Sequence, residues 1–188
     1  MGGSKAPVQG AFLFSAHLYP PLKRSFGTDF APVCNMAKNK ISRPEYVIRH
    51  QLGRNGKFPN NPQLPLVIYK SVLQPGNDEP ASFAEDLLNQ NDWKNSWRNG
   101  VHHFHHFHSN THEVLAVYSG TSQVMFGGPD GKIEDLEKGD VVILPAGMSH
   151  KRIEADGDFA CVGAYPAGKS WDMHKGEDGD IAKLKENI

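Results

Sequence analysis

The chain has 188 residues, of which 38% are hydrophobic and 22% are charged, and its 20 basic and 21 acidic side chains nearly cancel. This length predicts one domain with a core large enough to need no disulfide framework. The balanced charge gives no electrostatic case for a nucleic-acid partner, and no apolar run reaches the roughly 18 residues that would span a bilayer. Neither nucleic acid nor a membrane is therefore expected as a partner.

The N-terminal segment 1–43 differs in composition from the rest. Residues 1–40 hold five basic side chains and a single acid, Asp29. We interpret 1–43 as a disordered tail, with a cleaved organellar (for example mitochondrial) targeting peptide as the alternative. Cys34 and Cys161 lie far apart and form no CxxC motif, which favours two free thiols in a reducing compartment. We accordingly expect a cytoplasmic protein.

The next elements in chain order are one strand and one helix. The Val/Ile/Tyr-rich run 66–73 predicts a strand. Segment 78–91 begins with acids and a proline and then repeats apolar residues at helical spacing, which predicts a helix. Trp93 and Trp97 follow it, and we expect these indoles to pack against that helix or to roof a pocket.

Short strands separated by Gly, Pro and Asp turns dominate the rest of the chain. The expected strands are 102–108, 114–118, 121–126, 132–136, 141–144 and 159–164. This spacing is typical of an all-β sandwich or barrel. We expect the domain to occupy 44–175, with a polar C-terminal tail over 176–188.

Six histidines and one glutamate lie between Gly100 and Gly120. Side chains alternate between the two faces of a strand, so His106 and His108 share one face. The next strand brings back either Glu113 or His112 beside them. Glu113 is favoured because it shares its face with core-type residues two and four positions later, but periodicity alone leaves both open.

A second segment supplies one more histidine. His150 follows a turn built on Pro145 and Gly147, which is sharp enough to swing its imidazole toward the first group. Three imidazoles and one carboxylate suit Fe(II), Mn(II), Ni(II), Cu(II) or Zn(II), with positions left for substrate or water. We expect the other histidines of the tract, His102, His103 and His105, to lie at the surface or around the ligands.

Two classes of side chain are candidates for the wall of such a pocket. Apolar candidates are Phe104, Leu115, Val117 and Met148, which suit an aromatic or apolar substrate. Tyr118, Arg152, Tyr165 and Trp97 are also within reach of a pocket, but we interpret them as packing or surface residues.

These two segments together resemble the cupin family, which carries two spaced motifs. The first reads here as Gly100, five residues, His106-Phe107-His108, four residues, Glu113, six residues and Gly120. The second reads as Gly139, five residues, Pro145-Ala146-Gly147, two residues, His150, three residues and then Glu154 in place of the family's asparagine. The details around both motifs are similar to the YjlB-like branch of single-domain cupins.

The resemblance implies a fold, a ligand set and a range of functions. It implies a double-stranded β-helix, or jelly-roll barrel, with a short N-terminal helix-containing extension. It implies that His106, His108, Glu113 and His150 bind one divalent transition metal, with Fe(II) as first choice. We expect a metal-dependent enzyme with oxygenase or oxidoreductase chemistry on a small organic substrate, or decarboxylase or isomerase chemistry.

A non-catalytic metal-containing cupin that binds a small ligand is the alternative. Pairing of two chains across a sheet edge, which would give a homodimer, is a further expectation.

Overall fold

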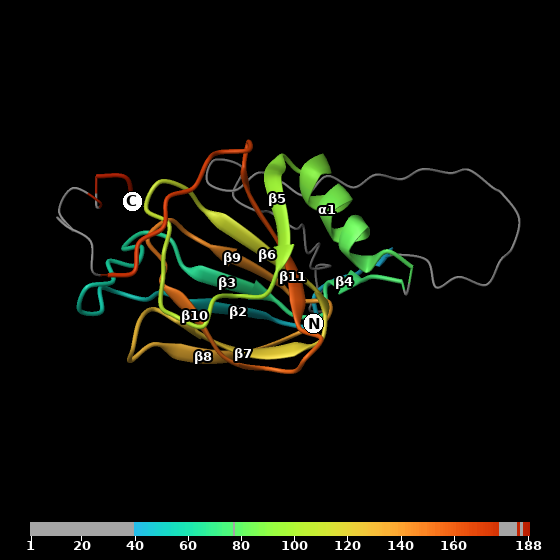
Figure 1. Ribbon diagram of the computed structural model, residues 1–188, viewed down its shortest axis with the longest axis horizontal. Coiled ribbons are helices and arrows are strands. Elements are labelled where there is room, and N and C mark those ends of the chain that lie inside the picture. The colour runs from blue at the N-terminus through green and yellow to red at the C-terminus, as the bar shows by residue number, and fades with distance from the viewer. Residues whose placement is uncertain (1–39, 77, 177–183, 185) are drawn as a thin grey trace, which may run out of the picture.

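The computed structural model describes residues 40–76, 78–176, 184 and 186–188 (Figure 1). In chain order its elements are β1 (Lys40–Ile41), β2 (Val47–His50), β3 (Leu66–Tyr69), β4 (Leu73–Gln74), α1 (Pro80–Gln90), β5 (Trp93–Asn99), β6 (Glu113–Ser119), β7 (Thr121–Phe126), β8 (Lys132–Glu137), β9 (Val141–Leu144), β10 (His150–Ala155) and β11 (Ala160–Pro166).

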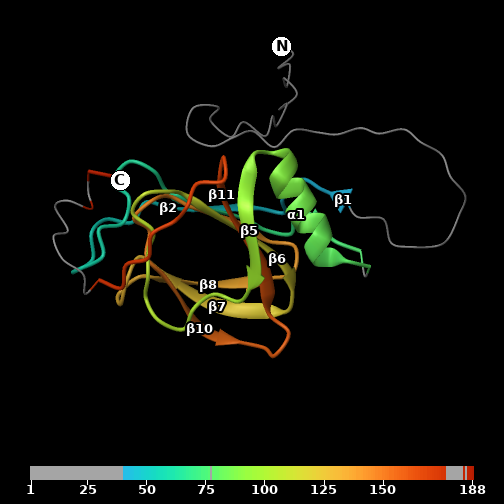
Figure 2. The same ribbon diagram turned by 45° about the horizontal axis from the view of Figure 1, so that its top comes forward.

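Two antiparallel sheets form the body of the fold. The larger has the order β2-β3-β9-β6-β11-β5 and the smaller the order β10-β7-β8. The two sheets lie across from each other, with α1 alongside β5 on the outside of the larger sheet (Figures 1 and 2). A separate two-stranded pairing joins β1 to β4. The predicted all-β jelly-roll class, with a helix before the histidine-rich segment, is confirmed.

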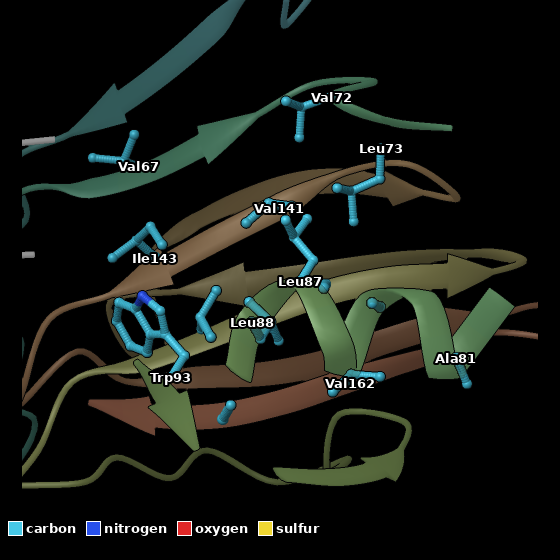
Figure 3. Packing of buried hydrophobic residues seen from close by; sticks show 14 residues of the cluster. Val67, Val72, Leu73, Ala81, Leu87, Leu88, Trp93, Val141, Ile143 and Val162 are labelled. Atoms are coloured by element: carbon cyan, nitrogen blue, oxygen red, sulfur yellow. The ribbon is translucent and has the colours of Figure 1, made fainter. Parts of the chain in front are cut away.

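Strand alternation divides the apolar residues into two buried clusters. On β6, Leu115 and Val117 face the interior between the sheets, whereas Val114 and Ala116 face outward. The outward cluster is covered by α1 through its buried residues Ala81, Ala84, Leu87 and Leu88 (Figure 3). The two-residue period of a strand thus assigns one face of the large sheet to the barrel interior and the other to the helix. Glu113, two residues before Leu115, lies on the interior face.

The structure corrects the sequence prediction in several places. Residues 102–108 form an irregular loop and not a strand, with isolated bridges at His106 and Phe107. Strand β5, an edge strand paired with β11, was not among the predicted strands, whereas its Trp93 packs with α1 in the outward cluster, as expected. Strand β10, which carries His150, was not among the predicted strands.

Other boundaries shift only slightly. The predicted strand 66–73 is split into β3 and β4, since Ser71 adopts a left-handed backbone conformation with φ 56°. The predicted helix 78–91 becomes Pro80–Gln90, with proline in its first turn.

The expected N-terminal tail 1–43 falls outside the described residues except for 40–43, where β1 lies. Cys34 lies outside them as well, whereas Cys161 is a buried free thiol of β11. Much of the expected C-terminal tail 176–188 is also outside the described part. No helix among the described residues is long and apolar enough to cross a membrane.

Candidate metal centre

The two histidine-bearing segments meet at one end of the barrel through their backbones. The His106 N–H donates to the His150 carbonyl at 3.1 Å, and the His150 N–H donates back to the His106 carbonyl at 2.9 Å. The Gly147 N–H, in the turn before β10, donates to the His108 carbonyl at 2.7 Å. The loop that carries His106 and His108 is therefore fastened to the strand that carries His150.

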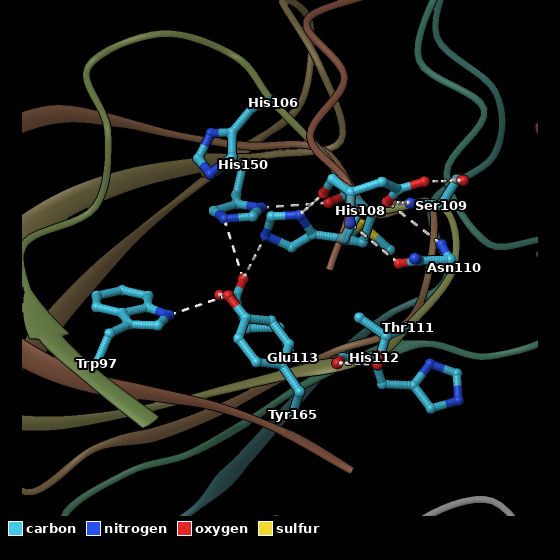
Figure 4. Close-up of polar contacts among 12 residues, drawn as sticks. Trp97, His106, His108, Ser109, Asn110, Thr111, His112, Glu113, His150 and Tyr165 are labelled. Carbon is cyan, nitrogen blue, oxygen red and sulfur yellow. Dashed lines mark hydrogen bonds and ion pairs between the residues drawn. The ribbon is translucent and has the colours of Figure 1, made fainter. Parts of the chain in front are cut away.

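Four side chains converge at this junction (Figure 4). The ligand nitrogens of His106, His108 and His150 lie within 4.8 Å of one another, and all three residues are buried. Glu113 enters from the start of β6, with its Oε2 atom 3.5 Å from His108 Nε2 and 3.3 Å from His150 Nε2. The structure thus brings together all four residues that the sequence singled out, from one loop and the starts of two strands.

The second nitrogen of each imidazole is fixed by a backbone carbonyl. His106 Nδ1 donates to the Phe104 carbonyl at 3.2 Å, and His150 Nδ1 donates to the Met148 carbonyl at 3.3 Å. His108 Nδ1 donates to the carbonyl of Asp172. A carbonyl only accepts, so each neutral ring carries its proton on Nδ1 and keeps the Nε2 lone pair free.

Burial and neighbouring charge determine the protonation of the group. Burial lowers the pKa of His106 to about 4. Burial, together with the nearby His106 and His108, holds the pKa of His150 well below its usual value. Burial also acts on His108, but the adjacent Glu113 outweighs it and raises that pKa. Without a bound cation, at most one of the three rings holds an extra proton near neutral pH.

The donor set fits a transition metal ion. Within the described part of the chain, Glu113 Oε2 is buried and has no hydrogen-bond partner, an arrangement that normally costs stability. A cation held among the Nε2 atoms would give this oxygen the partner that it lacks. Imidazole nitrogens anchored through Nδ1 are the usual arrangement of metal-binding histidines. Three such nitrogens and one carboxylate oxygen suit Fe, Mn, Ni, Cu or Zn.

The remaining histidines of the tract lie apart from this group. His112, the sequence alternative to Glu113, accepts a hydrogen bond from the Ala146 N–H at 2.9 Å through its Nδ1. It thereby supports the turn before His150 and does not face the three imidazoles. The ring of His102 lies 5.0 Å from that of His106, at the mouth of the pocket, and His103 is exposed. His105 lies against Phe58, with ring centroids 5.3 Å apart.

A cavity of about 160 Å³ opens over the four side chains. Its other walls are largely aromatic and apolar, and include Trp97, Val101, His102, Leu115, Tyr165, Trp171 and Met173. Trp97, which we expected to pack or to roof a pocket, lines the cavity, and so does Tyr165, which is also a buried packing residue.

Of the apolar wall candidates, Leu115 alone lines the cavity. Val117 and Met148 are buried in the inner core, and Phe104 stacks on His102 with ring centroids 4.8 Å apart. Neither Tyr118, which packs against the outer cluster, nor Arg152 is among the lining residues.

A hydrogen-bonded chain runs from Trp97 to Glu113. The indole Nε1–H donates to Tyr165 Oη at 2.9 Å, and the Tyr165 hydroxyl donates to Glu113 Oε1 at 3.0 Å (Figure 4). Burial and the Glu113 charge raise the pKa of Tyr165, so its hydroxyl keeps the proton that it donates.

A C-terminal segment, which the sequence prediction did not associate with the site, also holds the histidine-rich loop in place. The carboxylate of Asp172 accepts the Ser109 N–H at 2.7 Å and the Ser109 hydroxyl at 2.5 Å. His174 Nε2 contacts the same carboxylate at 2.9 Å. The preceding Trp171 lies over His108, with ring centroids 5.4 Å apart. No local signal in the sequence connects these residues with the histidines.

A larger groove of about 630 Å³ lies near the ends of β7, β8 and β10 that are remote from His150. Carboxylates line it and no histidine or cysteine does: Glu134, Asp135, Glu137, Glu154 and Asp156. Among the described residues, the group whose ligand atoms lie close enough to hold a metal consists of His106, His108 and His150, and no residue of this groove belongs to it. We therefore place the chemistry at the smaller cavity.

Comparison with known proteins gives one close sequence relative. The family model described as Cupin matches residues 98–160. The uncharacterized protein YjlB of Bacillus subtilis (strain 168) is 38% identical over 134 residues, which cover 71% of this chain and 78% of the relative.

Similar solved structures are more distant. A mutant of Bacillus subtilis oxalate decarboxylase is 18% identical with a TM-score of 0.36, over 59% of this chain and 27% of that protein. Acireductone dioxygenase from Bacillus anthracis, with a cadmium ion in its active centre, is 19% identical with a TM-score of 0.33, over 43% of this chain and 55% of that protein. The chain thus spans less than two thirds of the length of either protein.

Proposed function

Because the chain belongs to the cupin family, in its YjlB-like branch, we propose that its histidine-rich centre is the site of a metal-dependent small-molecule enzyme. His106, His108, His150 and Glu113 hold one divalent transition metal ion, with Fe(II) as first choice. The observation that carries this proposal is that three imidazoles anchored through Nδ1 converge with a buried carboxylate oxygen that has no hydrogen-bond partner among the described residues.

When bound, such a metal supplies Lewis acidity toward an oxygen-bearing substrate and, if it is iron, the capacity to use dioxygen. The protein supplies the rest of the site. Nδ1 hydrogen bonds to carbonyls orient the three rings, and burial of His106 and His150 keeps them neutral and available as donors. Four protein ligands leave room for substrate in the coordination sphere.

The cavity walls support a small organic substrate with a planar or apolar body. Trp97, Tyr165 and Trp171 present aromatic surface to the cavity. Arg98 is the cationic side chain among the lining residues, and it forms an ion pair with Glu85 of α1, outside the cavity. A substrate would therefore gain its binding energy mainly from the metal and from aromatic contact, which favours an aromatic or apolar compound.

The test begins with metal content. Tag-free wild-type protein, His106→Ala and the control His103→Ala are analysed by mass spectrometry after reconstitution with iron. We expect about one metal ion per chain in wild type and in His103→Ala, whose ring lies outside the group, and a large loss in His106→Ala. Absence of metal from reconstituted wild type contradicts the proposal.

The second candidate function is a non-catalytic cupin that binds a small ligand. The narrow cavity over the centre, about 160 Å³, also suits a ligand pocket without turnover. Oxygen uptake by the iron-loaded protein with a panel of small aromatic and apolar compounds separates the two. Ligand-dependent uptake supports the oxygenase, whereas tight binding without uptake supports the binding module.

A further inference from the structure

The two oxygens of the Glu113 carboxylate have different surroundings. Oε1 accepts a hydrogen bond from Tyr165 at 3.0 Å. Oε2 faces His108 and His150 at 3.5 and 3.3 Å and has no hydrogen-bond partner among the described residues. One oxygen is therefore engaged by Tyr165, and the other is directed at the imidazoles of His108 and His150 (Figure 4).

The direction of the Tyr165 hydroxyl proton follows from its second partner. An indole N–H only donates, so the contact from Trp97 Nε1 at 2.9 Å uses a lone pair of Tyr165 Oη. The single hydroxyl proton is then left for Glu113 Oε1. Trp97 thus orients Tyr165, and Tyr165 orients Glu113.

The sheet is built to place Trp97 and Tyr165 together. Trp97 on β5 lies opposite Gly163 on β11, and the register shifts between Gly163 and Tyr165. A Cβ atom at Gly163 would lie 2.2 Å from the indole ring of Trp97. The bare glycine and the register shift therefore let the indole approach β11 closely beside the tyrosine, within reach of its hydroxyl.

We propose that Tyr165, oriented by Trp97, is a positioning residue that holds the Glu113 carboxylate so that only Oε2 is available to the metal. This inference rests on the proposed function, because it assigns a role within the same centre. A carboxylate held in this way would offer only Oε2 to a bound metal and would leave room beside it for substrate. A carboxylate released at Oε1 can rotate or bind through both oxygens, which would close that space.

The test uses Mn(II) as a probe, because its electron paramagnetic resonance spectrum reports on the symmetry of the ligand field without any turnover. Full-length metal-free protein is titrated with Mn(II) as wild type, Tyr165→Phe, Trp97→Phe and the control Tyr118→Phe. Tyr118 packs against the outer cluster, so its variant removes the same hydroxyl away from the centre. Circular dichroism checks that each variant is folded.

We expect Tyr165→Phe to change the zero-field splitting and to weaken Mn(II) binding by about 10- to 100-fold, as the loss of a partner of a metal ligand usually does. Trp97→Phe should change the spectrum in the same direction but less, and Tyr118→Phe should match wild type. If Tyr165→Phe does not fold, Trp97→Phe decides, since it removes only the orienting donor.

Two outcomes overturn the inference and differ in what they leave standing. If wild type binds Mn(II) and the folded Tyr165→Phe variant shows the same spectrum and affinity, the positioning role is wrong and the metal centre stands. If wild type binds neither Mn(II) nor Fe(II), the proposed function fails, and the positioning role fails with it.

Discussion

Replacement of Gly163 by alanine tests the packing that holds Trp97 over the centre. The added Cβ would meet the Cε2 and Cζ2 atoms of Trp97 at 2.2 Å and its Nε1 atom at 2.6 Å, whereas ordinary van der Waals contact begins at 3.4 Å. The indole is a rigid ring on an adjacent strand, so it must move as a whole by more than an ångström. A movement of that size breaks the hydrogen bond from Nε1 to Tyr165, which is 2.9 Å long.

The expected change in stability combines two destabilising contributions with one stabilising contribution. Overpacking costs about 1–3 kcal/mol, and the lost hydrogen bond costs about 1 kcal/mol. Replacing glycine in a strand returns roughly 0.5–1 kcal/mol through the smaller entropy of the unfolded chain. We therefore expect the free energy of unfolding to fall by about 2 kcal/mol.

The assay is urea denaturation of metal-free protein, with near-ultraviolet circular dichroism as the signal of the tryptophan environment. Gly157→Ala is the matched control, because a Cβ at Gly157 meets no atom within 4 Å. We expect Gly157→Ala to be at least as stable as wild type. Equal stability of Gly163→Ala and wild type, with an unchanged tryptophan signal, would refute the packing argument.

Three further predictions concern the centre and its support. Asp172→Ala removes the acceptor of both Ser109 hydrogen bonds, so urea denaturation should show that the free energy of unfolding falls by about 2 kcal/mol. Because the segment that anchors His108 is loosened, calorimetry should show metal affinity about tenfold weaker. Unchanged stability and unchanged affinity would contradict this role. In metal-free protein the pKa of His106 is lowered to about 4, so the unfolded chain binds the proton more readily. Stability that is fully present above pH 6.5 is then lost as pH falls toward 4, by roughly 3 kcal/mol for this group. The lowered pKa of His150 changes stability with pH in the same direction, and the raised pKa of His108 changes it in the opposite direction. Urea midpoints measured across this pH range check the sign of the change. His106→Gln is the control, and its stability should depend much less on pH. Finally, metal at a hundred times its dissociation constant should raise the free energy of unfolding by about 2.7 kcal/mol, and a chelator should reverse this gain. A melting temperature that changes with neither the metal nor the chelator would argue against a metal site in the folded protein.

The two-residue periodicity of strands was sufficient to predict which face of the sheet holds Glu113. The alternation of apolar residues on β6 placed Glu113 on the same face as Leu115 and Val117, and in the structure that face is the barrel interior. The same reasoning paired His106 with His108 on a predicted strand that is in fact a loop. The pairing still holds because an extended loop, like a strand, directs alternate side chains to opposite sides.

The supporting residues could not be predicted in this way. Trp97 and Tyr165 are 68 positions apart, and Ser109 and Asp172 are 63 positions apart. Their contacts depend on which strands become neighbours and on a bulge that shifts the register by one residue. Local pattern carries information about faces and turns, whereas these contacts are set by the tertiary arrangement of the sheet.

The main-chain anchoring of the three imidazoles has a consequence for sequence change. The acceptors are carbonyl oxygens of residues 104, 148 and 172, and every amino acid supplies that oxygen. Evolution can therefore replace Phe104 and Met148 without disturbing the tautomers of the ligands, provided the backbone keeps its path. A designer has the same freedom at Phe104, which stacks on the cavity residue His102 and does not itself line the cavity.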